Sequence, residues 1–352
     1  MPYLYAHACC SALAREAILA SGPAQNSLRE RLAQKSGAAA TPPFDGLLDA
    51  DDGPVARIQS RFPLFQWGAQ GPDIWFYHAL IRPFRSLRRW GNRIHAENVD
   101  LTMEALLDSV LAAQGRERDG RFAYFCGFLT HYALDAAAHP FVHSRCGSHA
   151  YHTMFEAEVD TALLALSGES PKTVPPASTM PALSREDAAV VADMQSAVAA
   201  RWGESVPKKA LASIVKKAPA ILARQHDPKG RKRALALAFE RLFTGGRPVA
   251  SRFFFPLAAD EERDVLNLRH SVWPLPWSGE PRTEDFLSLL ERAALRAAAY
   301  IRTLYESAYC GAPGFSVLSA IGQLSLDNGL PWRESFVNEP FHAGVYGTKS
   351  RR

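Results

Sequence analysis

Histidines and acids recur at helical spacing in the first half of the chain. His131, Asp135 and His139 follow one another at intervals of four residues, and His152 and Glu156 repeat that interval further on. Residues four apart lie on one face of a helix, so each row presents its imidazoles and carboxylates to the same side. Imidazoles and carboxylates without thiolates are typical of zinc sites that keep a position open for water. The two rows therefore predict metal ions held between two adjacent helices.

Helices are the elements that must position these rows. Alanine and leucine are abundant and alternating runs of β-branched residues are scarce, which favours an all-α fold. The expected helices span residues 3–20, 121–144, 149–167, 184–203, 207–225 and 283–309. Gly120 is expected to interrupt the chain before the central helix. The stretch RFPLFQWGAQGPDIWFYHAL, residues 61–80, is expected to form an irregular apolar loop buried against the rest of the protein.

The length of 352 residues allows a large buried core. We expect residues 1–167 to form a metal-binding helical core. A segment rich in proline and serine then leads into residues 168–352, which we expect to form a helical extension packed on the same domain.

Features of the N-terminus and the cysteines bear on the compartment. Arg15 and Glu16 interrupt the apolar N-terminal stretch, which also lacks the basic region of a signal peptide. No segment reaches the roughly 20 apolar residues that span a bilayer. The five cysteines have no CxxC spacing, which is typical of free thiols in a reducing compartment. These features predict a cytoplasmic location, with export by a non-classical route left open.

Five motifs occur in one order along the chain. They are a first helix carrying His7, GPDIWFYH with Asp73, GNRIH with His95, HYALDAAAHP with His131, Asp135 and His139, and HTMFE with His152 and Glu156. In type and order these motifs resemble the bacterial zinc-dependent phospholipase C superfamily, which also includes single-strand-specific zinc nucleases. The resemblance covers about the first 165 residues and implies an all-α, multi-helix bundle with a metal cleft.

The resemblance also implies a ligand set. One zinc ion would be held by Asp73, His95, His131 and Asp135, and a second by His139, His152 and Glu156. A third would be held by His7, by Asp135 as a bridge, and by the N-terminal residue. No cleavage site precedes His7 that would free such a residue, so we expect two or three ions. Phe141 stands where secreted relatives have the second site's first histidine; we favour His139, which continues the row, and His143 is the alternative.

The resemblance implies a phosphodiesterase of phospholipase C type that releases diacylglycerol and a phosphorylated head group. A hydroxide bridging two metal ions would attack phosphorus, with Asp73 and Asp135 as the catalytic carboxylates. The closing His152 and Glu156 pair favours the phospholipases, since the nucleases usually end in Asp. The alternatives are a nuclease or phosphatase with the same metal site, or a metal- or lipid-binding protein without turnover.

Two further features bear on the partner. The aromatic residues Trp67, Trp75, Phe76 and Tyr77 are typical of core packing, and the alternative is a wall that recognises a quaternary ammonium group. The basic residues between 208 and 233 are typical of a solvated face, and the alternative is contact with an anionic membrane surface. The net charge of +4 is mild and no aromatics interleave with the basic residues, which argues against nucleic acid. Phospholipid is therefore the expected substrate, and the oligomeric state is open.

Overall fold

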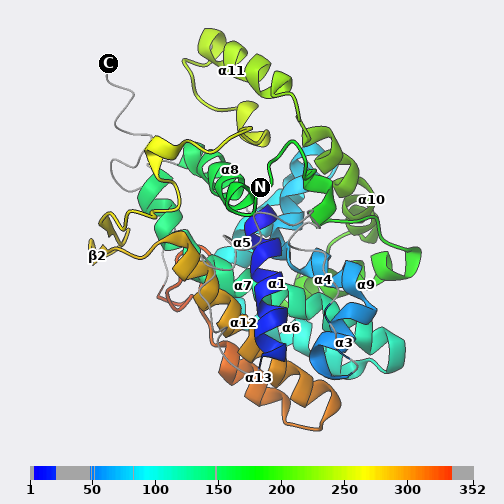
Figure 1. The fold of residues 1–352 in the computed structure, drawn as a ribbon. Coiled ribbons are helices and arrows are strands. Elements are labelled where there is room, and N and C mark those ends of the chain that lie inside the picture. Colours follow the sequence, from blue (N-terminus) through cyan, green and yellow to red (C-terminus); the bar gives the residue numbers. More distant parts are fainter. Residues whose placement is uncertain are drawn as a thin grey trace.

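Helices form most of the described chain. The computed structural model describes residues 4–20, 48, 50, 52–81, 83–146 and 149–334 (Figure 1). The α-helices are α1 (Leu4–Leu19), α3 (Gly53–Ser60), α4 (Phe62–Gly68), α5 (Arg89–Ala96), α6 (Val99–Ala112), α7 (Gly115–Cys146), α8 (His149–Leu166), α9 (Arg185–Arg201), α10 (Lys208–Gln225), α11 (Arg231–Phe243), α12 (Phe286–Tyr309) and α13 (Gly314–Ile321). The all-α prediction is confirmed.

Short 3-10 helices and one small hairpin complete the fold. The 3-10 helices are η1 (Gly71–Leu80), η2 (Arg85–Arg88), η3 (Pro176–Thr179), η4 (Ser251–Phe253) and η5 (Glu261–Arg263). Strands β1 (Trp273–Pro274) and β2 (Pro281–Arg282) pair antiparallel, with Trp273 opposite Arg282. Among the described residues, no helix has both the length and the hydropathy of a membrane-spanning segment.

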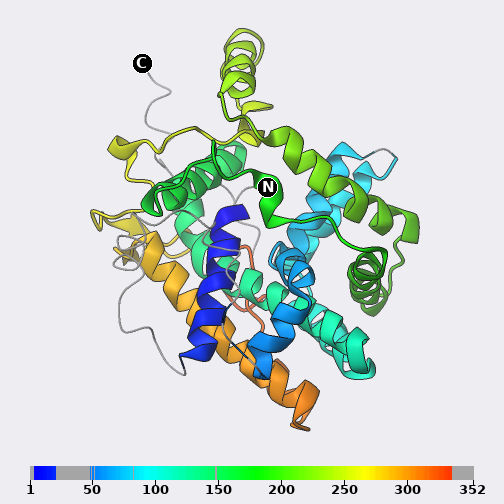
Figure 2. The same cartoon turned by 45° about the vertical axis from the view of Figure 1, so that its right-hand side comes forward.

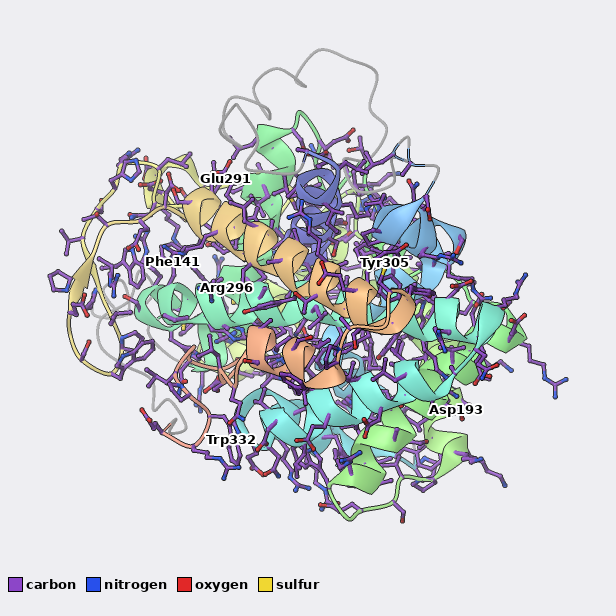
Figure 3. The ribbon with its side chains drawn as sticks, turned by 90° about the horizontal axis from the view of Figure 1, so that it is seen from below. Phe141, Asp193, Glu291, Arg296, Tyr305 and Trp332 are labelled. Carbon is purple, nitrogen blue, oxygen red and sulfur yellow. The ribbon has the colours of Figure 1, made fainter. Side chains whose placement is uncertain are left out.

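Helix α7 is the axis of the molecule. Its middle, residues 122–136, is buried on every side, as expected for a helix whose apolar residues do not keep to one stripe. Helices α1, α4, α8 and α12 all pack against it. Figure 3 shows α12, which carries Glu291, Arg296 and Tyr305, running across α7. One apolar core includes residues from α1 through to the segment after α13. The domain division at residue 167 stays a prediction.

The first helix is held at both ends. At its N-terminus, the Asp160 carboxylate of α8 accepts hydrogen bonds from the backbone N–H groups of Tyr5 (3.3 Å) and Ala6 (2.9 Å). These N–H groups have no partner within the helix, so the Asp160 oxygens satisfy them. Burial raises the pKa of this acid to about 8, although the two hydrogen bonds favour its ionised form. At the other end, Arg302 of α12 donates to the carbonyl of Ala17 at 2.7 Å. Figures 1 and 2 both show α1 alongside α12. This clamp sets the depth of His7.

The expectation of an irregular loop over residues 61–80 is wrong. Helix α4 and the 3-10 helix η1 occupy that stretch, and each has a proline, Pro63 or Pro72, in its first turn. Proline fits that position because the first N–H groups of a helix are unpaired and its φ is already helical. The prolines therefore start helices here instead of breaking them.

The predicted break at Gly120 is also wrong, because α7 begins at Gly115 and runs through that residue. A mid-helix glycine costs about 1 kcal/mol against alanine, a penalty that packing against Leu64 and Arg61 overrides.

Helices α4 and α7 touch through glycines. A Cβ atom on Gly127 would collide with the carbonyl of Phe65, and one on Gly68 with the carbonyl of Tyr124. Backbone atoms cannot rotate away as a side chain can, so both positions require a residue without a side chain. This contact brings the end of α4 onto the part of α7 that carries His131.

We therefore expect Gly127→Ala to lower the free energy of unfolding by at least about 1–3 kcal/mol, since the overpacked atoms are backbone. The matched control is Gly120→Ala in the same helix, where the new Cβ would meet side-chain ends instead of backbone, Leu64 at 3.1 Å and Arg61 at 3.4 Å. There the gain in helix propensity of about 1 kcal/mol offsets the contact. Urea unfolding of both variants tests this. Equal losses would contradict the role of the glycine contact.

Candidate metal centre

The Asp135 carboxylate lies at the centre of a buried group of imidazoles. Its Oδ1 is 3.3 Å from Nε2 of His7 in α1. Its Oδ2 is 3.2 Å from Nε2 of His95 in α5 and 3.0 Å from Nε2 of His131, one turn back in α7. His139, one turn further on, places Nδ1 at 3.9 Å from the same oxygen. Three helices thus meet at one carboxylate, which is 1% exposed.

Asp73 joins this group from the 3-10 helix η1. Its Oδ1 lies 3.3 Å from Nε2 of His95. The turn before it depends on Gly71, whose φ of +49° is in the left-handed region and whose α-carbon lies against the His131 ring, where a Cβ would clash. Pro72 follows in the first turn of η1. The Gly-Pro-Asp motif therefore lets the chain pass the His131 ring closely and still present a carboxylate.

A second group forms between α7 and α8. Glu156 places Oε1 at 2.8 Å from Nε2 of His152, its neighbour one turn back in α8. The same oxygen lies 3.7 Å from Nε2 of His139 in α7. The two predicted rows therefore face each other, and His139 stands between the two groups.

Backbone carbonyls orient three of the imidazoles. The Nδ1 atoms of His95 and His131 lie 2.7 Å and 3.3 Å from the carbonyls of Gly91 and Ala69, and Nδ1 of His139 bonds the carbonyl of Leu326. A carbonyl can only accept, so each ring carries its proton on Nδ1. In the neutral form of each ring, Nε2 is then the lone pair that binds a metal.

Two acids of α8 near the second group have partners elsewhere. Glu158 accepts a hydrogen bond from Arg263 at 2.8 Å, and Asp160 holds the start of α1.

The donor atoms fit zinc. Among the described residues, four groups of side chains offer ligand atoms within 4.8 Å of one another. Three of them contain the predicted ligands: His7, His131 and Asp135; Asp73, His95 and His131; and His139, His152 and Glu156. Two ligands of a tetrahedral zinc at about 2.0–2.1 Å lie about 3.3 Å apart. The Nε2–Oδ separations around Asp135 of 3.0–3.3 Å are close to that value. Among the described residues, no hydrogen bond reaches His131 Nε2 or Asp135 Oδ1, although both are buried. A cation between them would satisfy both atoms.

The charges of the site are set by burial and by mutual attraction. Burial, helped by the neighbouring His131, lowers the pKa of His7 to about 3, so that ring is neutral. Burial alone would raise the pKa of Asp135, but His131 and His139 hold it well below its usual range. Burial likewise opposes the ionised form of Glu156, and His152 with His139 keeps its pKa below the usual range. The site therefore contains ionised carboxylates that attract cations.

The sequence did not indicate the residues that close the site from the C-terminal side. Asp327, in the segment after α13, places Oδ1 at 3.3 Å from Nε2 of His143. The N–H groups of Leu326 and Asp327 donate to the carbonyl of His95 at 2.8 Å and 3.3 Å. The Leu326 carbonyl holds His139 as described above. One short segment thus contacts three histidines from two helices.

His143 remains an alternative ligand. Its ring centroid lies 4.9 Å from that of His152, and the two rings with the Cys146 thiol could also surround an ion. The assignment of each side chain to an ion stays a prediction, and the expected N-terminal ligand lies outside the described residues.

Core packing explains most of the aromatic stretch. Trp67, Trp75 and Tyr77 are at most 1% exposed, and the Trp75 indole donates to Gln195 at 2.7 Å. Phe76 lies closer to the centre, with its ring 5.8 Å from that of His95.

The comparisons with known proteins agree with this geometry. The family model described as "Zinc dependent phospholipase C" matches residues 38–225, more than half of the chain. That range contains seven of the eight predicted ligands and leaves out His7. The comparisons with curated proteins and with solved structures found no match.

We expect the zinc affinity of the metal-free protein to rise with pH. Burial would lower the pKa of His139, but Asp135 and Glu156 raise it to about 9, so a proton must leave before this ring can bind metal. Proton competition therefore weakens zinc binding below that pH and fades as the pH approaches 9. Titration of the metal-free protein against a chromogenic chelator at several pH values measures this. An affinity that stops rising above the ordinary imidazole pKa of 6.5 would contradict it.

We expect Asp327→Asn to weaken zinc binding by about 10- to 100-fold, because it removes the carboxylate that faces His143. The matched control is Asp193→Asn on α9, an exposed aspartate that Figure 3 labels. The same chelator competition measures both variants, and circular dichroism checks that both are folded. Equal affinities for Asp327→Asn and the wild type would show that the segment does not support the site.

Proposed function

Because the chain belongs to the zinc-dependent phospholipase C family, we propose that it is a zinc-dependent phosphodiesterase that cleaves a phospholipid into diacylglycerol and a phosphorylated head group. The observation that carries this proposal is the convergence of imidazoles and ionised carboxylates from α1, α5, α7, α8 and η1. Burying so many titratable groups together costs free energy as each leaves water, and bound metal ions would offset that cost.

The buried Asp135 lies at the deep end of the site, and the more exposed Asp73 lies at its rim. We assign one zinc ion to Asp73, His95, His131 and Asp135, a second to His139, His152 and Glu156, and a third to His7 and Asp135. Bound zinc supplies Lewis acidity toward the phosphodiester oxygens and lowers the pKa of water toward neutrality.

The two aspartates have different tasks in this proposal. The Asp135 side chain is 2% exposed and lies among four imidazoles, so it holds ligands in place. The Asp73 side chain is 17% exposed and lies at the rim. Burial would raise the pKa of Asp73, but the hydrogen bond from His95 keeps it below its usual value. Asp73 is therefore ionised and accessible, and it orients the attacking water and accepts its proton.

We expect the protein, isolated with its metal, to release phosphocholine from phosphatidylcholine vesicles. Asp73→Asn should lower the turnover by about 10²-fold or more, because asparagine cannot accept the proton. Asp193→Asn, the exposed control, should leave it unchanged. Elemental analysis of the same samples reports whether zinc is kept, which separates a lost base from a lost ion.

Single-stranded DNA and a chromogenic phosphodiester are assayed beside the vesicles. Cleavage of DNA without cleavage of lipid would replace the phospholipase by a nuclease. Bound zinc with no turnover of any substrate would leave a metal-binding protein without this activity.

A further inference from the structure

Helix α11 presents an apolar face to solvent. Leu235, Phe239, Leu242 and Phe243 are 73%, 52%, 78% and 71% exposed. Their spacing of i, i+4, i+7 and i+8 places them on one side of the helix. Val249, in the turn that follows, is 51% exposed. Of the ten large apolar side chains exposed among the described residues, five belong to this face.

A neighbouring side of α11 packs on the protein. Ala236 and Glu240 are buried there, and the helix rests on η4. The Glu240 carboxylate accepts hydrogen bonds from the N–H groups of Val249, Ala250 and Ser251 at 2.6–2.9 Å. The helix is thus fixed in one orientation with its apolar face outward. Figures 1 and 2 both show α11 at the outer edge of the molecule, beyond α10.

The apolar face lies in the most basic part of the chain. Residues 208–252 contain 12 lysines and arginines and only two acids, Asp227 and Glu240, a net charge of +10 in a chain whose total is +4. Both acids are buried and accept backbone N–H groups, Asp227 that of Arg233 at 2.9 Å. The exposed charge of this stretch is therefore positive. Within it, the rings of Phe239 and Phe243 pack with their centroids 4.7 Å apart.

From these observations we propose that α11 docks the protein on an anionic phospholipid surface. Its apolar face would enter the acyl boundary while Arg231, Arg241 and Arg247 meet the phosphates. Exposed leucines and phenylalanines on one face with basic residues around them are what an interfacial helix requires. The charge selects this partner over a second copy of the chain, since two faces of like charge repel. The helix lies outside the residues that match the family model. The proposal rests on the proposed function only in taking phospholipid as the partner.

Vesicle co-sedimentation of the full-length protein tests the docking. We expect binding to vesicles of equal parts phosphatidylcholine and phosphatidylglycerol, weaker binding to pure phosphatidylcholine, and release by salt. The double variant Leu242→Ser/Phe243→Ser should bind at least about tenfold more weakly, since it removes two highly exposed apolar side chains. The matched control is Phe315→Ser on α13, which removes a side chain that is 74% exposed on another helix.

Hydrolysis of a soluble phosphodiester separates docking from catalysis. The double variant should keep this activity, because α11 carries none of the predicted ligands. Wild-type protein that fails to bind anionic vesicles would overturn the docking proposal, and so would a double variant that binds like the wild type. A dimer in light scattering that the double variant abolishes, without vesicle binding, would assign the face to a second copy. Vesicle binding without cleavage of any phosphodiester would overturn the proposed function and leave the docking intact.

Discussion

Burial of the Asp135 carboxylate is the constraint on which the rest of the site depends. An ionised carboxylate that leaves water without compensation costs on the order of several kcal/mol. Four imidazoles surround it, two from α7 and one each from α1 and α5. Of these, His131, His139 and His95 oppose the effect of burial and keep its pKa low. Those helices must therefore arrive at one point. The clamp on both ends of α1 and the glycine contact between α4 and α7 serve that requirement.

Local spacing explains why part of the site could be predicted from the sequence. His131, Asp135 and His139 share a face of α7 because they lie four residues apart, and His152 and Glu156 share one in α8 for the same reason. The prediction of an α-helix over each row was enough to place these side chains on one face. Asp73, His95 and His7 lie far away along the chain, and only the resemblance to a known family related them to the rows. The structure brings all of these side chains together.

Long-range packing explains what the sequence could not show. Nothing local indicates that Asp327 would face His143 across 184 residues, or that the Leu326 carbonyl would hold His139. The prolines of residues 61–80 suggested a loop because a proline can end a helix or begin one, and only the packing decides. Gly120 has the same ambiguity. Its intrinsic penalty is small, and the burial of α7 as a whole exceeds it.

The depth of the metal centre bears on how a phospholipid could reach it. Exposure increases from Asp135 toward Asp73 and, on the second side, toward His152 and Asp327, whose side chains are 15% and 28% exposed. On the proposed function, a phosphodiester would enter at the rim while its acyl chains remain in the bilayer. Exclusion of water strengthens the electrostatic interactions among the buried ligands. Groups that are buried in this way cannot attract a membrane. That task needs a separate surface, apolar and basic, outside the catalytic helices. The exposed face of α11 has both properties, and because it is not part of the metal centre, contact with lipid need not disturb the ligands.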